Sequence, residues 1–247
     1  MSTKTKKLVM FDFDDTLART EEVTLVKSKK HQKIVDHIRG QRDFDNYKLK
    51  SDKYYFDFSE FHHVSEYAKP IPNTLNLLKK FLKEPDTTTI VLTARQKQAE
   101  PAVKDYLKGL GIDTNNLPVF GCNGSSNKAN FLKNLIEKYG VQREVIVFED
   151  SISNIIDMLQ LEYEMPHLKF DFIQVIDPEN TDEDLDEARK NEYPTGEYGT
   201  EPYQRLLKRL HPAKKRRLIG LGGNNYLDQG HSNIKDFSRS KSAPPGG

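Results

Sequence analysis

The sequence predicts an α/β protein built on a parallel sheet of five strands, with helices on both faces of the sheet. Short apolar segments recur along the first 176 residues, and most lack the polar alternation of a half-exposed strand. Such segments are typical of strands covered on both faces. Apolar residues between them recur at helical spacing, which indicates a Rossmann-like arrangement. The predicted strands are Lys7–Phe13, Thr88–Leu92, Pro118–Gly121, Val145–Phe148 and Lys169–Ile176.

Two of the predicted helices have recognisable ends. Pro72 favours the start of a helix over Asn73–Lys83, and Gly140 ends a second helix over Asn130–Tyr139. About seventy residues separate the first two strands, and the first of these helices accounts for few of them. Residues 18–70 are therefore predicted to form an insertion. Its mixture of polar and aromatic residues favours a small flap, or lid, over a second full domain.

Composition limits the class of protein. The chain has 36% apolar and 30% charged residues, so part of it is expected to remain solvated. No segment approaches the roughly 18 apolar residues that a membrane span needs, and the apolar stretch after the Lys-rich start is too short for a signal peptide. We therefore expect a soluble, cytoplasmic protein without a membrane partner. The single cysteine, Cys122, excludes an internal disulfide and is expected to serve as packing.

Charge divides the chain unevenly. Residues 205–247 contain ten Lys or Arg against two acids, so the rest of the chain carries about −7 although the whole chain carries +1. Residues 1–176 are predicted to form the core, residues 177–211 an acidic segment with a C-terminal helix, and residues 212–247 a basic, Gly- and Pro-rich disordered tail. This tail could contact nucleic acid or a protein partner, although cationic tails are commonly only solvated.

Three carboxylates lie at the carboxyl end of the first predicted strand, at Asp12, Asp14 and Asp15. Ligands of open α/β sheets bind at the carboxyl ends of the strands. Clustered anions at this edge repel one another unless a cation compensates them, and Mg²⁺ prefers hard oxygen ligands. Asp12 and Asp14 should share one side of the chain while Phe13 points away, which allows Asp12 to attack phosphorus and Asp14 to move the proton. The alternative is an acidic turn that merely ends a strand.

This pattern resembles the haloacid dehalogenase superfamily of phosphohydrolases, whose first motif is present as Asp12, Asp14 and Thr16. The second motif matches Thr93, whose hydroxyl, with the neighbouring backbone N–H at Ala94, would hold phosphoryl oxygens. The third matches Lys128, with Lys133 as its nearest rival, and the fourth is present as the Glu149-Asp150 pair. The four motifs occur in order and extend over Lys7–Ile176.

The resemblance implies a magnesium site. It assigns the cation to the carboxylates of Asp12 and Asp150 and to the Asp14 backbone carbonyl, with Glu149 as a ligand or a support. Asn154 stands where many members have a second acid, and its role stays open. The sequence also resembles small phosphatase-like proteins of tailed bacteriophages, which would place it in the host cytoplasm. The predicted site also includes three substrate-binding residues, Thr16, Ala94 and Arg95.

The substrate is less specified than the chemistry. We expect a magnesium-dependent phosphatase acting through an aspartyl-phosphate on a phosphorylated small molecule or a nucleic-acid end. Arg95 could hold a second anionic group of the substrate or pair with a carboxylate. His62-His63 could suggest zinc, but neighbouring side chains on an extended segment diverge. A phosphotransferase and a catalytically inactive protein that docks a partner through its basic tail remain alternative hypotheses.

Overall fold

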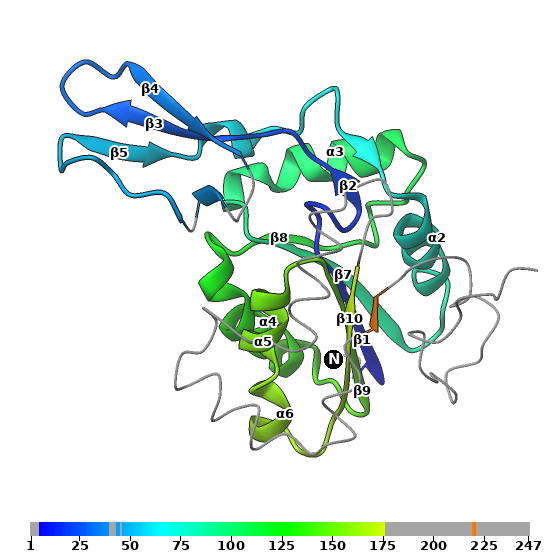
Figure 1. Ribbon diagram of the computed structural model, residues 1–247. Coiled ribbons are helices and arrows are strands. Elements are labelled where there is room, and N and C mark those ends of the chain that lie inside the picture. Colours follow the sequence, from blue (N-terminus) through cyan, green and yellow to red (C-terminus); the bar gives the residue numbers. More distant parts are fainter. Residues whose placement is uncertain (1–4, 40–42, 45, 176–218, 221–247) are drawn as a thin grey trace, which may run out of the picture.

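The computed structural model describes residues 5–39, 43–44, 46–175 and 219–220. Its main sheet has the order β11-β10-β9-β1-β7-β8, and all neighbouring strands in it are parallel (Figure 1). The predicted parallel sheet of five strands is confirmed as β8-β7-β1-β9-β10. The strands are β1 (Lys7–Phe11), β7 (Thr87–Thr93), β8 (Val119–Gly121), β9 (Glu144–Glu149), β10 (Lys169–Gln174) and the short β11 (Ile219–Gly220).

The strand bounds differ from the predicted ones mainly at the ends. β1 ends at Phe11 instead of Phe13, although the Asp12 backbone N–H still donates to the Phe148 carbonyl at 2.9 Å. β9 is longer than predicted and includes Glu149 as its last residue. A strand end is set by where backbone pairing stops, which local composition does not specify.

Helices cover both faces of this sheet, as predicted. Leu8 and Met10 of β1 pack with α4, α5 and α6, whereas Val9 and Phe11 pack with α2 and α3. These two groups of helices lie on opposite faces of the sheet (Figure 1). Because successive strand residues point to opposite faces, one unalternated apolar strand serves two cores. The helices are α2 (Pro72–Phe81), α3 (Glu100–Gly109), α4 (Lys128–Tyr139), α5 (Ile152–Met158) and α6 (Leu161–Glu164), with short 3-10 turns η1 (Ser59–His62), η2 (Lys97–Ala99) and η3 (Ser125–Asn127).

The predicted insertion contains two small antiparallel sheets. At its base, β2 (Ala18–Arg19) pairs with β6 (Lys69–Pro70). Farther out, β3 (Thr24–Ser28) lies between β4 (Ile34–Ile38) and β5 (Tyr54–Asp57), and these three strands project away from the main sheet (Figure 1). We call residues 18–70 the flap. Its first and last residues lie side by side at the loop that follows β1.

The predictions for residues 177–211 and for most of residues 212–247 lie outside the described residues. Two residues of the predicted tail, Ile219 and Gly220, pair with β10. Among the described residues, no helix combines the length and the apolar character needed to cross a membrane. Cys122 is buried in the core, and burial raises its thiol pKa to about 11, which suits a packing role.

Candidate active site

Four predicted site residues converge at one edge of the main sheet. Asp12 directly follows β1, Thr93 ends β7, Glu149 ends β9, and Lys128 begins α4. Parallel strands bring their carboxyl ends to the same edge, so Thr93 lies within hydrogen-bonding distance of Asp14 although the two are 79 positions apart in the sequence. All four residues are almost completely buried, with exposed fractions of 4% or less. The motifs recognised in the sequence therefore share one place in the fold.

The loop after β1 turns sharply between the two acids and the flap. Phe13 is fully buried in the core, whereas the Asp12 side chain pairs with Lys128 and the Asp14 side chain is 27% exposed. Asp15 has a φ of 53°, a left-handed conformation that Asp tolerates better than most residues. Its backbone N–H donates to the Ala18 carbonyl at 2.7 Å. This turn directs the chain into β2 while leaving the Asp12 and Asp14 side chains at the strand end.

Lys128 forms two buried ion pairs. Its Nζ atom lies 2.8 Å from Asp12 Oδ1 and 2.7 Å from Glu149 Oε2. Burial alone would lower the lysine pKa, but the charges of Asp12 and Glu149 outweigh it and raise the pKa above its ordinary value. Lys128 is therefore a permanent cation at neutral pH. Lys133, its rival in the sequence, instead pairs with Glu164 at 2.7 Å on the exposed side of α4.

The loop after β8 carries Lys128 into the site. Three backbone hydrogen bonds join this loop to the segment after β7: Cys122 N–H to Thr93 O at 3.0 Å, Gly124 N–H to Ala94 O at 2.7 Å, and Asn123 N–H to Arg95 O at 3.2 Å. The approach is so close that a Cβ atom on Gly121 would lie 2.5 Å from the Gln96 carbonyl oxygen. This pairing fixes where α4 begins, and with it the position of the lysine.

Glu149 is held from three directions. Besides the Lys128 ammonium, it accepts hydrogen bonds from Asn154 Nδ2 at 3.0 Å and from the Ser151 backbone N–H at 3.3 Å. Ser151 also caps α5, because its side chain accepts from the Asn154 backbone N–H. The spacing from Glu149 to Asn154 therefore follows from the first turn of α5. Asn154, whose role the sequence left open, stabilises the Glu149 carboxylate.

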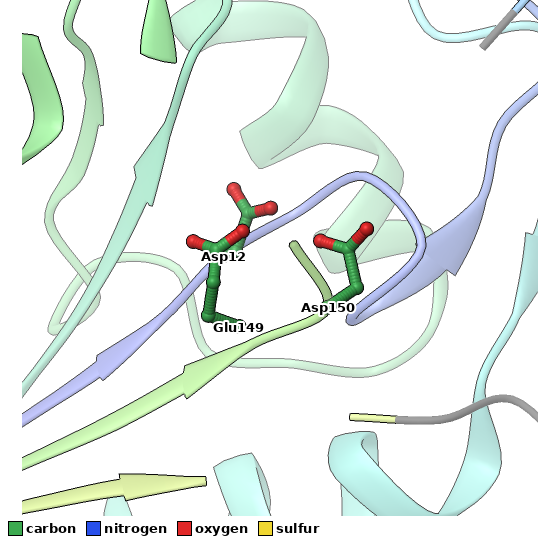
Figure 2. A group of neighbouring side chains, drawn as sticks. All are labelled: Asp12, Glu149 and Asp150. Carbon is green, nitrogen blue, oxygen red and sulfur yellow. The ribbon is translucent and has the colours of Figure 1, made fainter. Parts of the chain in front are cut away.

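Asp12, Glu149 and Asp150 form the acidic cluster of the site. One carboxylate oxygen of each lies within 4.8 Å of those of the other two, and the three side chains point to the same side of the strand ends (Figure 2). Burial, then repulsion from Glu149, raises the pKa of Asp12 to about 8 despite the nearby lysine. Burial and the charges of Glu149 and Asp12 also raise the pKa of Asp150 well above its ordinary value. The cluster has more negative charge than Lys128 alone compensates.

Asp14 has a different electrostatic environment. Arg95 approaches its carboxylate with two nitrogens, Nη2 at 2.7 Å from Oδ1 and Nε at 3.1 Å from both oxygens. The hydroxyls of Thr20 and Thr93 donate to it at 2.8 and 3.2 Å. Burial acts to raise the pKa of Asp14, but Arg95 and Thr20 outweigh it and hold the pKa below its ordinary value. The two predicted catalytic acids thus have pKa values shifted in opposite directions.

The residues predicted to contact substrate take different positions. The Thr16 side chain is fully buried, and its Oγ1 has no hydrogen-bond partner among the described residues. Ala94 is half-buried, directly after Thr93. The Arg95 side chain is only 1% exposed and pairs with Asp14 and with Glu22. Of the two roles that the sequence left open for Arg95, the structure places it with carboxylates.

The aromatic residues of the flap pack mainly against one another. Phe56 contacts Phe44, Tyr47 and Phe58, and Phe58 in turn contacts Phe61, with ring centroids 4.9 to 6.5 Å apart. Of the adjacent histidines His62 and His63, His62 Nε2 lies 2.7 Å from the Gln96 side-chain oxygen, and His63 is exposed. The contact between His62 and Gln96 attaches the flap to the segment after β7.

Sequence reasoning missed two residues of the site, Glu22 and Thr20, and left the role of a third, Asn154, open. Glu22 and Thr20 lie in the first segment of the flap and contact Arg95 and Asp14, and Asn154 contacts Glu149. Glu22 and Thr20 stand in a polar stretch with no periodicity, so no signal distinguishes them from solvated residues. For Asn154 the sequence did contain a signal, its spacing from Glu149. This spacing places both residues at the same end of α5.

Comparisons with known proteins add little to this geometry. No family model matches the sequence, and no curated protein matches it. Among solved structures, two crystal structures of the Legionella pneumophila effector Ceg4 align with 77% of this chain and with 96% and 97% of theirs. One carries an N-terminal TEV protease cleavage sequence and the other an N-terminal yeast Hog1p sequence, and they share 15% and 16% identity with this chain at a TM-score of 0.37. Likeness at that level carries no argument about function.

Proposed function

We propose that this protein is a phosphohydrolase of the haloacid dehalogenase type, in which Asp12 is the nucleophile. The observation that carries the proposal is the buried ammonium of Lys128, 2.8 Å from Asp12 at the carboxyl edge of a parallel sheet. A cation at this position stabilises both the ionised nucleophile and the negative charge of a phosphoryl group that approaches it. An acidic turn that merely ended a strand would gain nothing from a fully buried lysine, whose desolvation is costly.

The two acids divide the reaction. An oxygen of Asp12 would attack phosphorus and form an aspartyl-phosphate, while the bond to the leaving oxygen breaks. Asp14 would donate a proton to that oxygen and then accept one from the water that hydrolyses the intermediate. Arg95 lowers the pKa of Asp14 and so favours the carboxylate form that accepts the proton in the second step, whereas donation in the first step requires that Asp14 has first bound a proton from solvent. The Thr93 hydroxyl, which donates to Asp14 in the structure, and the Ala94 backbone N–H would bind the phosphoryl oxygens.

The acidic cluster fits a magnesium ion by the chemistry of its donors. Its three carboxylates are hard oxygen ligands, and the raised pKa values of Asp12 and Asp150 support a further cation there. Asp12 and Asp150 would hold the cation, together with the Asp14 backbone carbonyl. Glu149 already accepts three hydrogen bonds and acts as a support for Lys128. When bound, the cation would neutralise charge on the phosphoryl oxygens.

Replacing the nucleophile tests the reaction. Asp12→Asn should abolish magnesium-dependent hydrolysis of p-nitrophenyl phosphate, whereas Asp105→Asn, at an exposed position of α3, should leave it unchanged. Acid quenching of wild-type protein during turnover of a ³²P-labelled substrate should trap label that hydroxylamine releases, as expected for an acyl phosphate. Turnover by Asp12→Asn at the wild-type rate contradicts the assignment.

The metal site has a test that does not depend on turnover. Titration of wild-type protein with Mg²⁺ in a calorimeter should give one site, and Asp150→Asn should weaken it at least about tenfold because a ligand is lost. The exposed Asp105→Asn variant is again the matched control. Equal affinity in wild type and Asp150→Asn would remove Asp150 from the ligands.

A nucleic-acid end is a second candidate substrate, favoured by the charge of the flap. Four exposed lysines gather at the turns that join its strands: Lys29, Lys30, Lys33 and Lys53. The Lys29 backbone N–H donates to the Lys53 carbonyl at 2.8 Å, and the Ser28 N–H donates to the Lys33 carbonyl at 2.9 Å, so these turns are adjacent. Asp52 is also exposed at these turns, but the four lysines outnumber it, so the turns carry a net positive charge. Such a charge attracts the phosphate backbone of a nucleic acid.

The two substrate classes are separable. If the second candidate is correct, 3′- or 5′-phosphorylated oligonucleotides should react faster than nucleoside monophosphates, and the advantage should decrease with added salt. Replacing Lys29, Lys30 and Lys33 together by Gln should remove that advantage and leave p-nitrophenyl phosphate turnover intact. Replacing Lys79, Lys80 and Lys83 by Gln is the matched control on the main domain. Oligonucleotides that react no faster than monophosphates would exclude this candidate.

A further inference from the structure

Arg95 connects the candidate active site to the flap through a single side chain. It directly follows the predicted phosphoryl-binding residues Thr93 and Ala94, and only 1% of its side chain is exposed. On one side, Nε and Nη2 contact the Asp14 carboxylate at 3.1 and 2.7 Å. A guanidinium presents its donors in a rigid planar fork, so these contacts fix the orientation of Asp14 relative to Arg95.

The other donors of the same guanidinium reach both ends of the flap. Nη2 lies 3.2 Å from Glu22 Oε2, at the start of the flap. Nη1 donates to the backbone carbonyls of Phe61, at 3.1 Å, and of His63, near the end of the flap. The second oxygen of Glu22 accepts from the Ser65 backbone N–H at 2.7 Å. Glu22 and Arg95 thus join the outgoing and returning segments of the flap.

Two aromatic rings enclose this junction. The guanidinium carbon lies 5.3 Å from the centroid of the Phe13 ring and 5.4 Å from that of the Phe61 ring. Phe13 belongs to the core beside Asp14, and Phe61 belongs to the flap. Cation–π contacts of this kind are stronger in desolvated positions. The Arg95 side chain therefore lies between the core and the flap. Its nitrogens contact polar groups of both parts, and the faces of its guanidinium lie near one aromatic ring of each.

A buried cation shared by two carboxylates makes their positions interdependent. If either carboxylate moves away, the guanidinium is left partly unpaired in a medium where an uncompensated charge is costly. If the flap moves, it displaces Glu22 or the carbonyls of Phe61 and His63. Arg95 must then move with these partners, and Asp14 must move with Arg95. The reverse also holds, because coupling between two sites is reciprocal.

We infer that Arg95, with Glu22, is a positioning residue that couples the placement of the flap to the orientation of the Asp14 carboxylate. The coupling is a property of the fold. Its consequence for proton transfer rests on the proposed function, in which Asp14 moves the proton. A substrate that displaces the flap would then change how Asp14 faces the leaving oxygen. Substrate recognition by the flap and proton transfer at the strand end would be one linked event.

The coupling itself is measurable by hydrogen exchange, without any turnover. Asp14→Asn weakens the Arg95 contact from the active-site side, and it should increase exchange of the Ser65 amide, in the flap, at least about tenfold. Arg95→Met should do the same. Lys128→Met is the matched control, since it also perturbs the active site but does not touch Arg95, and rates are normalised to amides of β9. Ser65 exchange that stays at the wild-type rate in Asp14→Asn overturns the inference.

Leaving-group dependence tests the catalytic consequence. Glu22→Gln should lower kcat for an alkyl phosphate at least about tenfold but lower kcat for 2,4-dinitrophenyl phosphate less than about threefold, because a good leaving group needs no proton from Asp14. Glu21→Gln, at the exposed neighbouring position, should change neither rate. Arg95→Lys should show the same dependence on the leaving group. Equal losses for both substrates would show that Arg95 and Glu22 only anchor the flap.

The two experiments separate the inference from the proposed function. If the wild-type protein hydrolyses no phosphate ester, the proposed function fails, and the exchange of Ser65 in Asp14→Asn still decides the coupling. If hydrolysis is observed and Asp12→Asn abolishes it, while Ser65 exchange is unaffected by Asp14→Asn, the coupling fails and the phosphohydrolase remains.

Discussion

Lys128 Nζ lies 2.8 Å from Asp12 Oδ1, and both side chains are buried at the carboxyl edge of the main sheet. The lysine also pairs with Glu149 at 2.7 Å, so one cation serves two carboxylates. Burying this ion pair lowers the stability of the core, because the charges lose their hydration. It also holds the proposed nucleophile beside a fixed positive charge.

Removing this cation should affect both stability and turnover. Lys128→Met leaves Asp12 and Glu149 buried without their ammonium partner, and breaking a buried ion pair in this way typically costs about 3–5 kcal/mol. Denaturant unfolding in the presence of chelator measures the loss, and turnover of p-nitrophenyl phosphate should fall at least about a hundredfold. Lys133→Met, which removes a pair with side chains 38% and 39% exposed, should cost less than about 1 kcal/mol. Similar costs for the two variants would contradict the buried-pair account.

The pH dependence of stability should be unusual because of Asp12. The pKa of Asp12 is about 8 in the folded protein against 3.8 as its reference, so the folded state binds an extra proton between these values. Stability from this group is fully present below pH 3.8 and is lost as pH rises through about 8. In chelator, the free energy of unfolding of wild type should therefore decrease across this window, by at most about 1.4 kcal/mol per pH unit for one group.

Asp12→Asn removes this titration. Its unfolding free energy should vary less than that of wild type between about pH 5 and 8, a comparison that cancels contributions from all other groups. Added Mg²⁺ should also flatten the wild-type dependence, since a bound cation favours the ionised carboxylate. Parallel curves for wild type and Asp12→Asn would show that the titrating group is elsewhere.

Asn154→Asp should destabilise the site by adding a fourth carboxylate. Asn154 Nδ2 donates to Glu149 Oε1 at 3.0 Å, and an aspartate there would replace a buried donor by a like charge. We expect a loss of roughly 1–3 kcal/mol in chelator, measured by denaturant unfolding. Asn116→Asp is the matched control, because Asn116 also donates to a carboxylate, Asp113, at 3.1 Å, but is exposed. An Asn154→Asp variant as stable as wild type would mean that Glu149 does not need this donor.

Gly121→Ala tests the loop that places Lys128. The added Cβ would meet the Gln96 carbonyl oxygen at 2.5 Å, and backbone on both sides must move to admit it. A cost of about 1–3 kcal/mol and a lower kcat are expected, because the same loop pairs with Thr93, Ala94 and Arg95. Gly109→Ala, which meets no atom within 4 Å, should retain wild-type stability and activity. If Gly121→Ala is neutral in both assays, this contact does not position the site.

Local pattern was sufficient for the sheet, and the motif resemblance was needed for the site residues. Unalternated apolar strands predicted burial on both faces, and the motifs placed Asp12, Thr93 and Glu149 at strand ends, which converge because parallel strands share one carboxyl edge. The tertiary structure decided the partner of each charge. Asp14 meets Arg95 across 81 residues of sequence, Glu22 reaches the same guanidinium from the flap, and Lys128 meets Glu149 across 21. Such pairings depend on which charges are buried together, and burial is a property of the folded chain that no local pattern contains.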